Sequence, residues 1–355
     1  MTGKPRIVLG LMGFGPEGSP GARITGLDEF KKALDIFQNR GYNEVDTARL
    51  YIGGLQEGFT REAGWKERGF SIATKVWPVP PGSHAPEALE KTFETSLKEL
   101  GTDCVDASSP SWPHSSRVAP GANESDRSVP FADTLEAVDR LHKAGKFKRL
   151  GLSNYAAFEV AEIVTTCRYR GWVRPTMYQG VYNCILRTVE DELIPICRRY
   201  GITFDAYSPT GGGFLAGKIK SKDDDPTEGR YARGPMSGWL RGRYFRDGII
   251  DGVQLIRAAA EERGLGAIEV AMRWLVHHSK LKIVDGTDGI VVAGSSLRQI
   301  EENLDYLEKG PLPDDLVEVL ERAWKMAKGD VEPYYQAPLE YAYDTQEVLF
   351  RPGSK

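Results

Sequence analysis

The stretch Glu44-Val45-Asp46-Thr47-Ala48-Arg49-Leu50-Tyr51 begins as a short strand around Val45 and ends in a polar turn before Gly53-Gly54. A second apolar run, Phe70-Ser71-Ile72-Ala73-Thr74-Lys75-Val76, follows after about one helix length of sequence. An aspartate, a tyrosine and a lysine therefore lie near the ends of two successive predicted strands. A lysine that a carboxylate holds in its charged form can lower the pKa of a phenol. These two strands predict a proton-donor site.

Short apolar runs alternate with amphipathic helical stretches along most of the 355 residues. Strands that are apolar on both faces and are each followed by a helix indicate a parallel sheet covered on both sides. Eight such strand–helix units in a chain of this length predict an α/β fold of the (β/α)8 TIM barrel type. We expect one domain over residues 1–355, with an extra C-terminal helix and an irregular tail over residues 330–355.

A doubly wound dinucleotide-binding sheet is the alternative fold. The turn after the first strand, Gly13-Phe14-Gly15-Pro16-Glu17-Gly18, has the spacing of its glycine fingerprint. However, Pro16 has no backbone N–H to offer a phosphate, and the nearest helix cap, Thr25, lies well downstream. The barrel is therefore favoured.

Composition excludes several classes of protein. The net charge of −4 and the pI of about 5.9 give no field for holding nucleic acid. The four cysteines and five histidines are scattered without zinc-ligand spacing, so we expect no metal site. No secretory signal and no apolar run of the ~20 residues that span a bilayer is evident. We expect no membrane association and a cytoplasmic location.

Six short motifs, in this order along the chain, resemble the aldo-keto reductase superfamily, most closely its aflatoxin-aldehyde reductase branch. They are Val8–Gly15, Asp46–Tyr51, Ile72–Lys75, Gly151–Asn154, Tyr178–Gly180 with Tyr182-Asn183, and Gly294–Asn303. The resemblance covers roughly residues 6–350. It implies a TIM barrel that uses NADPH, without a metal, to reduce small-molecule aldehydes and ketones.

The resemblance also implies roles for single residues. Tyr51 corresponds to the proton donor, and Lys75 and Asp46 to the pair that lowers its pKa. The residues that correspond to cofactor contacts are Asp46, Ser153, Asn154, Gln179, Tyr207, Ser208, Pro209, Gly211, Gly217, Lys218, Arg230, Ser295, Ser296, Arg298, Gln299, Glu302 and Asn303.

Chemistry supports three groups within this set. The amides of Asn154 and Gln179 offer the paired donor and acceptor that a nicotinamide carboxamide needs, with Tyr207 placed to stack on the ring. Glycines in the long loop 208–243 let backbone N–H groups approach a pyrophosphate. A helix N-terminus with hydroxyls and Arg298 suits a 2′-phosphate, so NADPH is favoured over NADH. Ordinary strand-end hydrogen bonds and an ordinary capped helix are the alternatives.

Substrate contacts are less specified by the sequence. Met12, Trp77 and Tyr182 would wall the pocket, although core packing explains these residue types equally well. Arg243 corresponds to an arginine that in this branch contacts acidic or dicarbonyl substrates, and a solvated loop arginine is the alternative.

The fourth strand departs from the family pattern. The family ends this strand in a histidine, whereas here Ser111 stands at that position and His114 lies three residues on. The segment 107–125, with three prolines, reads as an irregular insertion. Three interpretations are open: His114 replaces the histidine, the histidine is absent and the enzyme impaired, or the segment arises from an altered reading frame or splice choice.

The predicted function is NADPH-dependent reduction of aldehydes or ketones, with dialdehydes or intermediates of secondary metabolism as substrate classes. A barrel that senses NADPH and regulates a partner is the alternative, motivated by the fourth strand. The sequence leaves a homodimer open.

Overall fold

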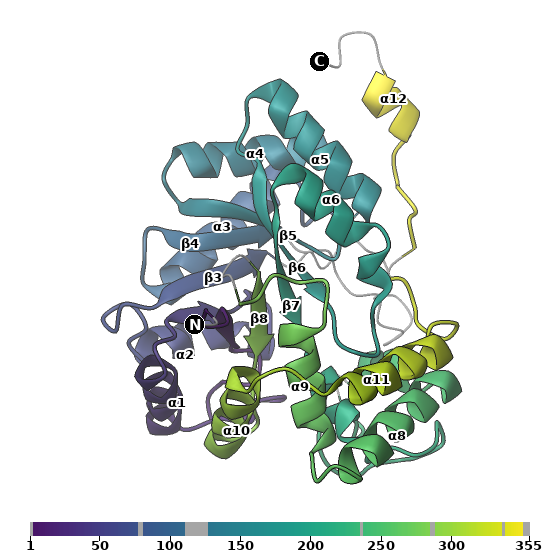
Figure 1. The fold of residues 1–355 in the computed structure, drawn as a ribbon. Coiled ribbons are helices and arrows are strands. Elements are labelled where there is room, and N and C mark those ends of the chain that lie inside the picture. The colour runs from purple at the N-terminus through teal and green to yellow at the C-terminus, as the bar shows by residue number, and fades with distance from the viewer. Residues whose placement is uncertain are drawn as a thin grey trace.

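Eight parallel strands close into a barrel in the order β1 to β8 (Figure 1). The computed structural model describes residues 3–76, 81–110, 127–234, 237–284, 288–335 and 338–350. The strands are β1 (Ile7–Gly10), β2 (Glu44–Asp46), β3 (Ser71–Val76), β4 (Val105–Pro110), β5 (Phe147–Ser153), β6 (Pro175–Val181), β7 (Thr203–Tyr207) and β8 (Gly289–Val292). Pairing of β1 with β8 closes the ring. The predicted (β/α)8 barrel is confirmed.

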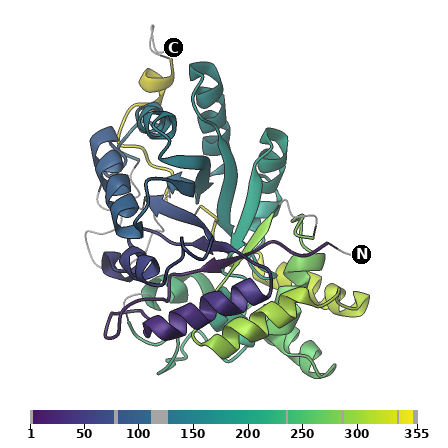
Figure 2. The ribbon, with the colours of Figure 1, turned by 90° about the vertical axis from the view of Figure 1, so that its left-hand side faces the viewer.

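Helices surround the barrel (Figures 1 and 2). The helices that follow the strands or precede the next one are α1 (Leu27–Asn39), α2 (Gln56–Glu62), α3 (Pro86–Leu100), α4 (Phe131–Lys143), α5 (Ala157–Arg170), α6 (Leu193–Tyr200), α8 (Asp247–Glu261), α9 (Ala267–His277), α10 (Leu297–Glu308) and α11 (Asp314–Ala327). Helix α1 shows why they pack there, because Phe30, Ala33, Leu34 and Phe37 recur at helical spacing and are fully buried. Glycines in the left-handed conformation end α3, α5 and α6.

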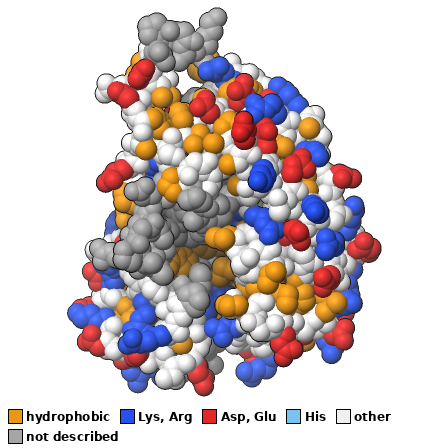
Figure 3. All heavy atoms as spheres, turned by 180° about the vertical axis from the view of Figure 1, so that it is seen from behind, with side chains coloured by type: hydrophobic (Ala, Val, Ile, Leu, Met, Phe, Trp, Pro, Cys, Tyr) orange, Lys and Arg blue, Asp and Glu red, His pale blue; other side chains and the backbone are white. Residues whose placement is uncertain are grey.

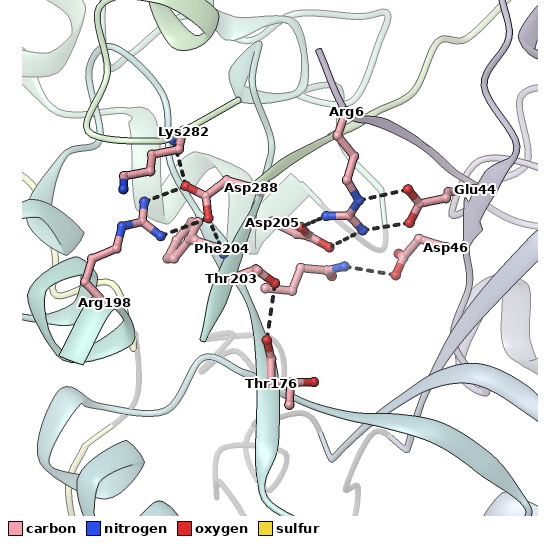
Figure 4. A network of polar contacts seen from close by, with 11 residues as sticks. Arg6, Glu44, Asp46, Thr176, Arg198, Thr203, Phe204, Asp205, Lys282 and Asp288 are labelled. Atoms are coloured by element: carbon pink, nitrogen blue, oxygen red, sulfur yellow. Dashed lines mark hydrogen bonds and ion pairs between the residues drawn. The ribbon is translucent and has the colours of Figure 1, made fainter. Parts of the chain in front are cut away.

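Ion pairs close the amino-terminal end of the barrel interior (Figure 4). Arg6 donates to Glu44 at 2.7 and 2.8 Å and to Asp205 at 2.5 Å. Burial raises the pKa of Asp205, and the guanidinium of Arg6 opposes that shift. The charged floor leaves the opposite, carboxyl end of the barrel for a binding site.

The fourth strand is more regular than its sequence suggests. Its backbone pairs with β3 from Ala107 through Pro110 and with β5 from Val105 through Ser108. Residues 107–110 are therefore strand, and the expectation of an insertion beginning at residue 107 was wrong. The rest of that segment, including His114, lies outside the described residues.

Two segments expected to be irregular contain helices. The loop 208–243 includes the short 3-10 helix η3 (Gly211–Ala216) and the first residues of α7 (Ser237–Tyr244). The tail includes α12 (Thr345–Phe350) and is tied to the barrel, because Tyr341 donates its hydroxyl hydrogen to Glu159 at 2.6 Å.

Charges of both signs alternate over the face shown in Figure 3. This arrangement agrees with the weak net charge, and the described side chains of that face form no large single-sign patch. Within the described parts of the chain, no helix is both long and apolar enough to cross a bilayer. The same residues contain no cluster of three or more side chains able to ligate a metal ion.

Candidate active site

Asp46 and Lys75 form a buried ion pair at the carboxyl ends of β2 and β3. The Nζ of Lys75 lies 2.6 Å from Oδ2 of Asp46 and donates a second hydrogen bond to the carbonyl of Thr47 at 2.7 Å. Both side chains are almost completely buried. The same Nζ lies 5.2 Å from the centre of the Tyr51 ring. The three residues predicted from the sequence are therefore brought together.

The electrostatics of this group differ in one respect from the expectation. Burial raises the pKa of Tyr51, whereas the ammonium of Lys75 lowers it, and the net direction is upward. Burial alone would lower the pKa of Lys75, but Asp46 and Tyr51 outweigh it and keep the ammonium charged. The predicted effect of Lys75 on the phenol is present, yet desolvation of the phenolate is the larger contribution.

Tyr51 lies at the start of a strained turn, the 3-10 helix η1 (Tyr51–Gly54). Ile52 has φ of 51°, in the left-handed region that β-branched residues rarely adopt. The side chain of Ile52 packs against Gly15. A Cβ at position 15 would lie 2.8 Å from that side chain, so position 15 requires a glycine. The first strand's loop therefore helps to fix the turn that carries Tyr51.

Gln179 reaches across the barrel to the carboxylate of Asp46. Its Nε2 donates to Oδ1 of Asp46 at 2.9 Å, from β6 to β2. Next to it, Asn154 follows β5 with φ of 63° and accepts a hydrogen bond from the Tyr207 hydroxyl at 2.9 Å. Ser153 is buried at the end of β5. The side chains predicted to meet a nicotinamide thus lie at the same barrel end as Tyr51.

The loop after β7 also adopts backbone conformations that favour glycine. Ser208 has φ of 55°, and its carbonyl accepts a hydrogen bond from Asn183 at 3.0 Å. Gly211 and Gly217, like the two glycines that follow Gly211, have positive φ. Pro209 is buried and Lys218 is exposed. The predicted role of this loop in covering a phosphate stays a prediction; its glycines and the exposed Lys218 are compatible with that role.

Arg230 is a half-buried cation near Tyr51. Its Nη2 lies 3.7 Å from the position of a Cβ on Gly13, and its Cδ lies 3.5 Å from that of Gly212. Burial and the neighbouring Arg23 lower the pKa of Arg230, and Tyr51 acts on it in the opposite direction. No carboxylate of the described residues forms an ion pair with it. Such a desolvated cation suits an anionic group of a ligand.

The turn between β8 and α10 is a capped helix start. Ser296 accepts a hydrogen bond from the N–H of Gln299 at 3.3 Å, and the Gln299 side chain accepts from Ser295 at 2.9 Å. Arg298 is exposed and lies 3.7 Å from Glu302. The residue Asn303 is buried and donates to a strand-end carbonyl at 3.0 Å, which is a structural role.

Two of the residues predicted to contact the substrate are buried. Tyr182 is fully buried, and its hydroxyl donates to Glu190 at 2.5 Å, so it belongs to the core and not to a pocket wall. Arg243 is also buried; its guanidinium carbon lies 4.2 Å from the centre of the Trp239 ring. Met12 is half-buried after β1. Trp77 lies outside the described residues.

One contribution to the site was missed from the sequence. Glu57, on α2, is completely buried and pairs with Arg49 of the Asp46–Tyr51 stretch at 2.5 Å. The sequence signal for this buried carboxylate was its place in α2 close to Phe59 and Thr60, which are also buried. Surface charge is the ordinary interpretation of such a residue, so the pattern alone did not reveal it.

Relatives of this chain carry related names. An aldo-keto reductase of Pseudocercospora fijiensis (strain CIRAD86) is 39% identical over 307 residues, which cover 85% of this chain and 99% of that protein. Aflatoxin B1 aldehyde reductase member 2 of Mus musculus is 36% identical over 343 residues, which cover 94% of this chain and 88% of the mouse protein.

A solved structure shares the fold. The aldo-keto reductase from Klebsiella pneumoniae in complex with NADPH superposes with a TM-score of 0.63 at 20% identity, covering 96% of this chain and 98% of that one. A model of the Aldo/keto reductase family matches residues 6–325, which is most of this chain. The chain belongs to the aldo/keto reductase family.

Proposed function

We propose that this chain reduces the carbonyl group of aldehydes and ketones with NADPH, and that Tyr51 is the proton donor. The observation that supports this most is the joining of Asp46, Lys75 and Tyr51 at the carboxyl end of the barrel. Active sites of TIM barrels lie at that end. The family is one of oxidoreductases.

The residues at this end fit NADPH as the cofactor. Asn154 and Ser208 hold left-handed backbone conformations next to the loop of glycines, and such strain is kept where a ligand requires it. Asn154 and Gln179 supply amide donors and acceptors, and the exposed Arg298 and Lys218 supply cations. When bound, NADPH supplies the hydride that adds to the carbonyl carbon.

The chain's own residues handle the proton. Negative charge develops on the carbonyl oxygen during reduction, and the Tyr51 hydroxyl donates its proton to that oxygen. The ammonium of Lys75 then stabilises the phenolate, and Asp46 holds Lys75 in its charged form. Gln179 fixes the second oxygen of Asp46, so the carboxylate cannot turn away from Lys75.

The substrate class is an aldehyde, including dialdehydes and intermediates of secondary metabolism. The mouse relative is named for reducing an aldehyde of aflatoxin B1, which supports this class. Arg230, a cation on which Tyr51 acts electrostatically, would attract substrates with a carboxylate. Arg243 stays a candidate for the same contact. His114 stays a candidate for orienting the carbonyl. A homodimer and a cytoplasmic location also stay predictions.

The first test is a set of aldehydes with purified protein, followed by loss of NADPH absorbance. We expect turnover with aromatic aldehydes and with aldehydes that carry a carboxylate, and no turnover when NADPH is left out. Absence of turnover across the whole set, despite tight NADPH binding, would overturn the proposed activity. The equivalent reaction with NADH should be slower, because Arg298 would find no 2′-phosphate.

A further inference from the structure

Glu57 is a buried carboxylate that the proton transfer does not use directly. Its side chain has no exposed surface. Oε2 accepts a hydrogen bond from Nη1 of Arg49 at 2.5 Å, and Oε1 accepts one from the hydroxyl of Thr74 at 2.7 Å. Thr74 is also fully buried and directly precedes Lys75 on β3. Glu57 therefore links helix α2 to the strand that carries Lys75.

Arg49 extends this link to the turn of Tyr51. Its Nη2 donates to the carbonyl of Gly54, the last residue of η1, and its backbone N–H donates to the carbonyl of Lys75 at 3.1 Å. A Cβ on Gly54 would lie 2.5 Å from Nη2 of Arg49, so only glycine allows this approach. One guanidinium thus closes the turn and pairs with Glu57.

The turn needs such support because its backbone is unfavourable. Ile52, directly after Tyr51, holds a left-handed conformation that costs free energy and persists only where the surroundings impose it. The Gly15 loop holds one side of the turn, and the pair of Arg49 and Glu57 holds the other. Without the pair, Ile52 could relax and carry Tyr51 away from Lys75.

We propose that Arg49 and Glu57 are positioning residues that set the distance between the Tyr51 phenol and the Lys75 ammonium. This inference rests on the proposed role of Tyr51 as proton donor. A displacement of about 1 Å at a reacting group can cost on the order of 100-fold in rate. The pair therefore acts on proton transfer and not on cofactor binding, since no contact joins either side chain to the predicted cofactor residues of the described chain.

The test is the double variant Arg49→Met with Glu57→Gln, which removes both charges and leaves no unpaired carboxylate buried. We expect kcat for aldehyde reduction to fall roughly 10- to 100-fold. The Kd of NADPH, measured by fluorescence quenching, should stay within about twofold, because the cofactor residues are untouched. Arg61→Met on the same helix, where the arginine is exposed, is the matched control and should change neither value.

A second readout does not depend on turnover. Ultraviolet difference titration of each protein against its Tyr51→Phe partner reports the pKa of Tyr51 directly. We expect this pKa to rise in the double variant, because the phenolate loses part of its attraction to Lys75. An unchanged titration of Tyr51 would overturn the inference, whether or not the protein reduces aldehydes. Reduction of aldehydes is tested separately, with the wild type alone.

Rescue separates positioning from mere folding. In Arg49→Ala, added ethylguanidine should restore part of kcat and lower the pKa of Tyr51 again, because the partly exposed site of Arg49 can admit it. Arg49→Lys should lie between wild type and Arg49→Ala. If kcat, NADPH affinity and melting temperature fall together in every variant, with no rescue, the pair is only structural. Should the double variant fail to fold, Glu57→Gln alone is measured with the same expected directions.

Discussion

At the scale of single residues, the site is a balance between burial and charge. Burial raises the pKa of Tyr51 more than Lys75 lowers it, so the phenol stays protonated at neutral pH, as the proposed role of proton donor requires. The phenolate that remains is stabilised only as long as Lys75 keeps its charge, which Asp46 maintains. The reduction rate should therefore fall only at high pH, where Tyr51 loses its proton before the substrate binds.

Arg230 offers a prediction about specificity. We expect Arg230→Gln to raise KM for aldehydes with a carboxylate by about 10- to 100-fold, since a hydrogen bond to a charged group contributes about 1.5–3 kcal/mol. KM for uncharged aldehydes should stay the same. Steady-state kinetics with matched pairs of aldehydes measures this.

The same variant decides between two roles of Arg230. If Arg230 instead contacts the cofactor, as its position in the sequence implies, Arg230→Gln should weaken NADPH binding whichever substrate is used. Arg233→Gln is the control, because Arg233 is exposed and pairs only at the surface with Asp225 at 3.0 Å. It should leave both KM and the Kd of NADPH unchanged.

At the scale of elements, the spacing and burial of apolar residues explain which strands and helices could be predicted from the sequence. The strands β1 and β8 are apolar at every position and were found as short continuous runs. The strand β4 was misread because Pro110 and the serines before it lack apolar character, although pairing with two neighbours holds the backbone extended. Helix α7 was missed because Gly and Arg in its sequence give no apolar stripe.

The end of α9 gives a prediction about stability. His278 caps this helix, and its Nε2 accepts the N–H of Leu312 at 2.9 Å, which requires the neutral ring. Burial and the adjacent His277 lower the pKa of His278 below its ordinary value. The stabilisation is therefore fully present above the unfolded pKa of about 6.5 and is lost as pH falls from there through the folded pKa.

Melting curves on either side of this range measure the effect. The free energy of unfolding should drop by about 1 kcal/mol or less between pH of about 7.5 and about 5, given one hydrogen bond in a partly solvated setting. His278→Gln should show a smaller drop than the wild type. An equal drop in both proteins would mean that other groups cause the pH dependence.

At the scale of the whole molecule, closure of the barrel joins residues that are remote in sequence. Gln179 and Asp46 are 133 positions apart, yet they share a hydrogen bond across the interior. The sequence could predict that both lie at strand ends, but not that they touch, because contact depends on the register around the ring. Tyr182 shows the converse, since its place in a motif did not reveal that its ring packs against Trp274 in the core.

The described part of the fourth strand gives no support to the alternative of a regulatory barrel. That alternative rested on a damaged fourth strand and on its displaced histidine. Strand β4 pairs with both neighbours through Ser108 and with β3 through Pro110, whereas His114 lies outside the described residues. Asp46, Lys75 and Tyr51 lie together on the same scaffold, which supports the proposed role of a reductase.

The measurement that tests the central claim most directly is the comparison of wild type with Tyr51→Phe at saturating NADPH and one good aldehyde. Removing the hydroxyl leaves the ring packing intact but takes away the proton. We predict a loss of at least about 100-fold in kcat, the usual contribution of a general acid, with the Kd of NADPH unchanged. A Tyr51→Phe protein that turns over like the wild type would contradict the assignment of Tyr51 as proton donor.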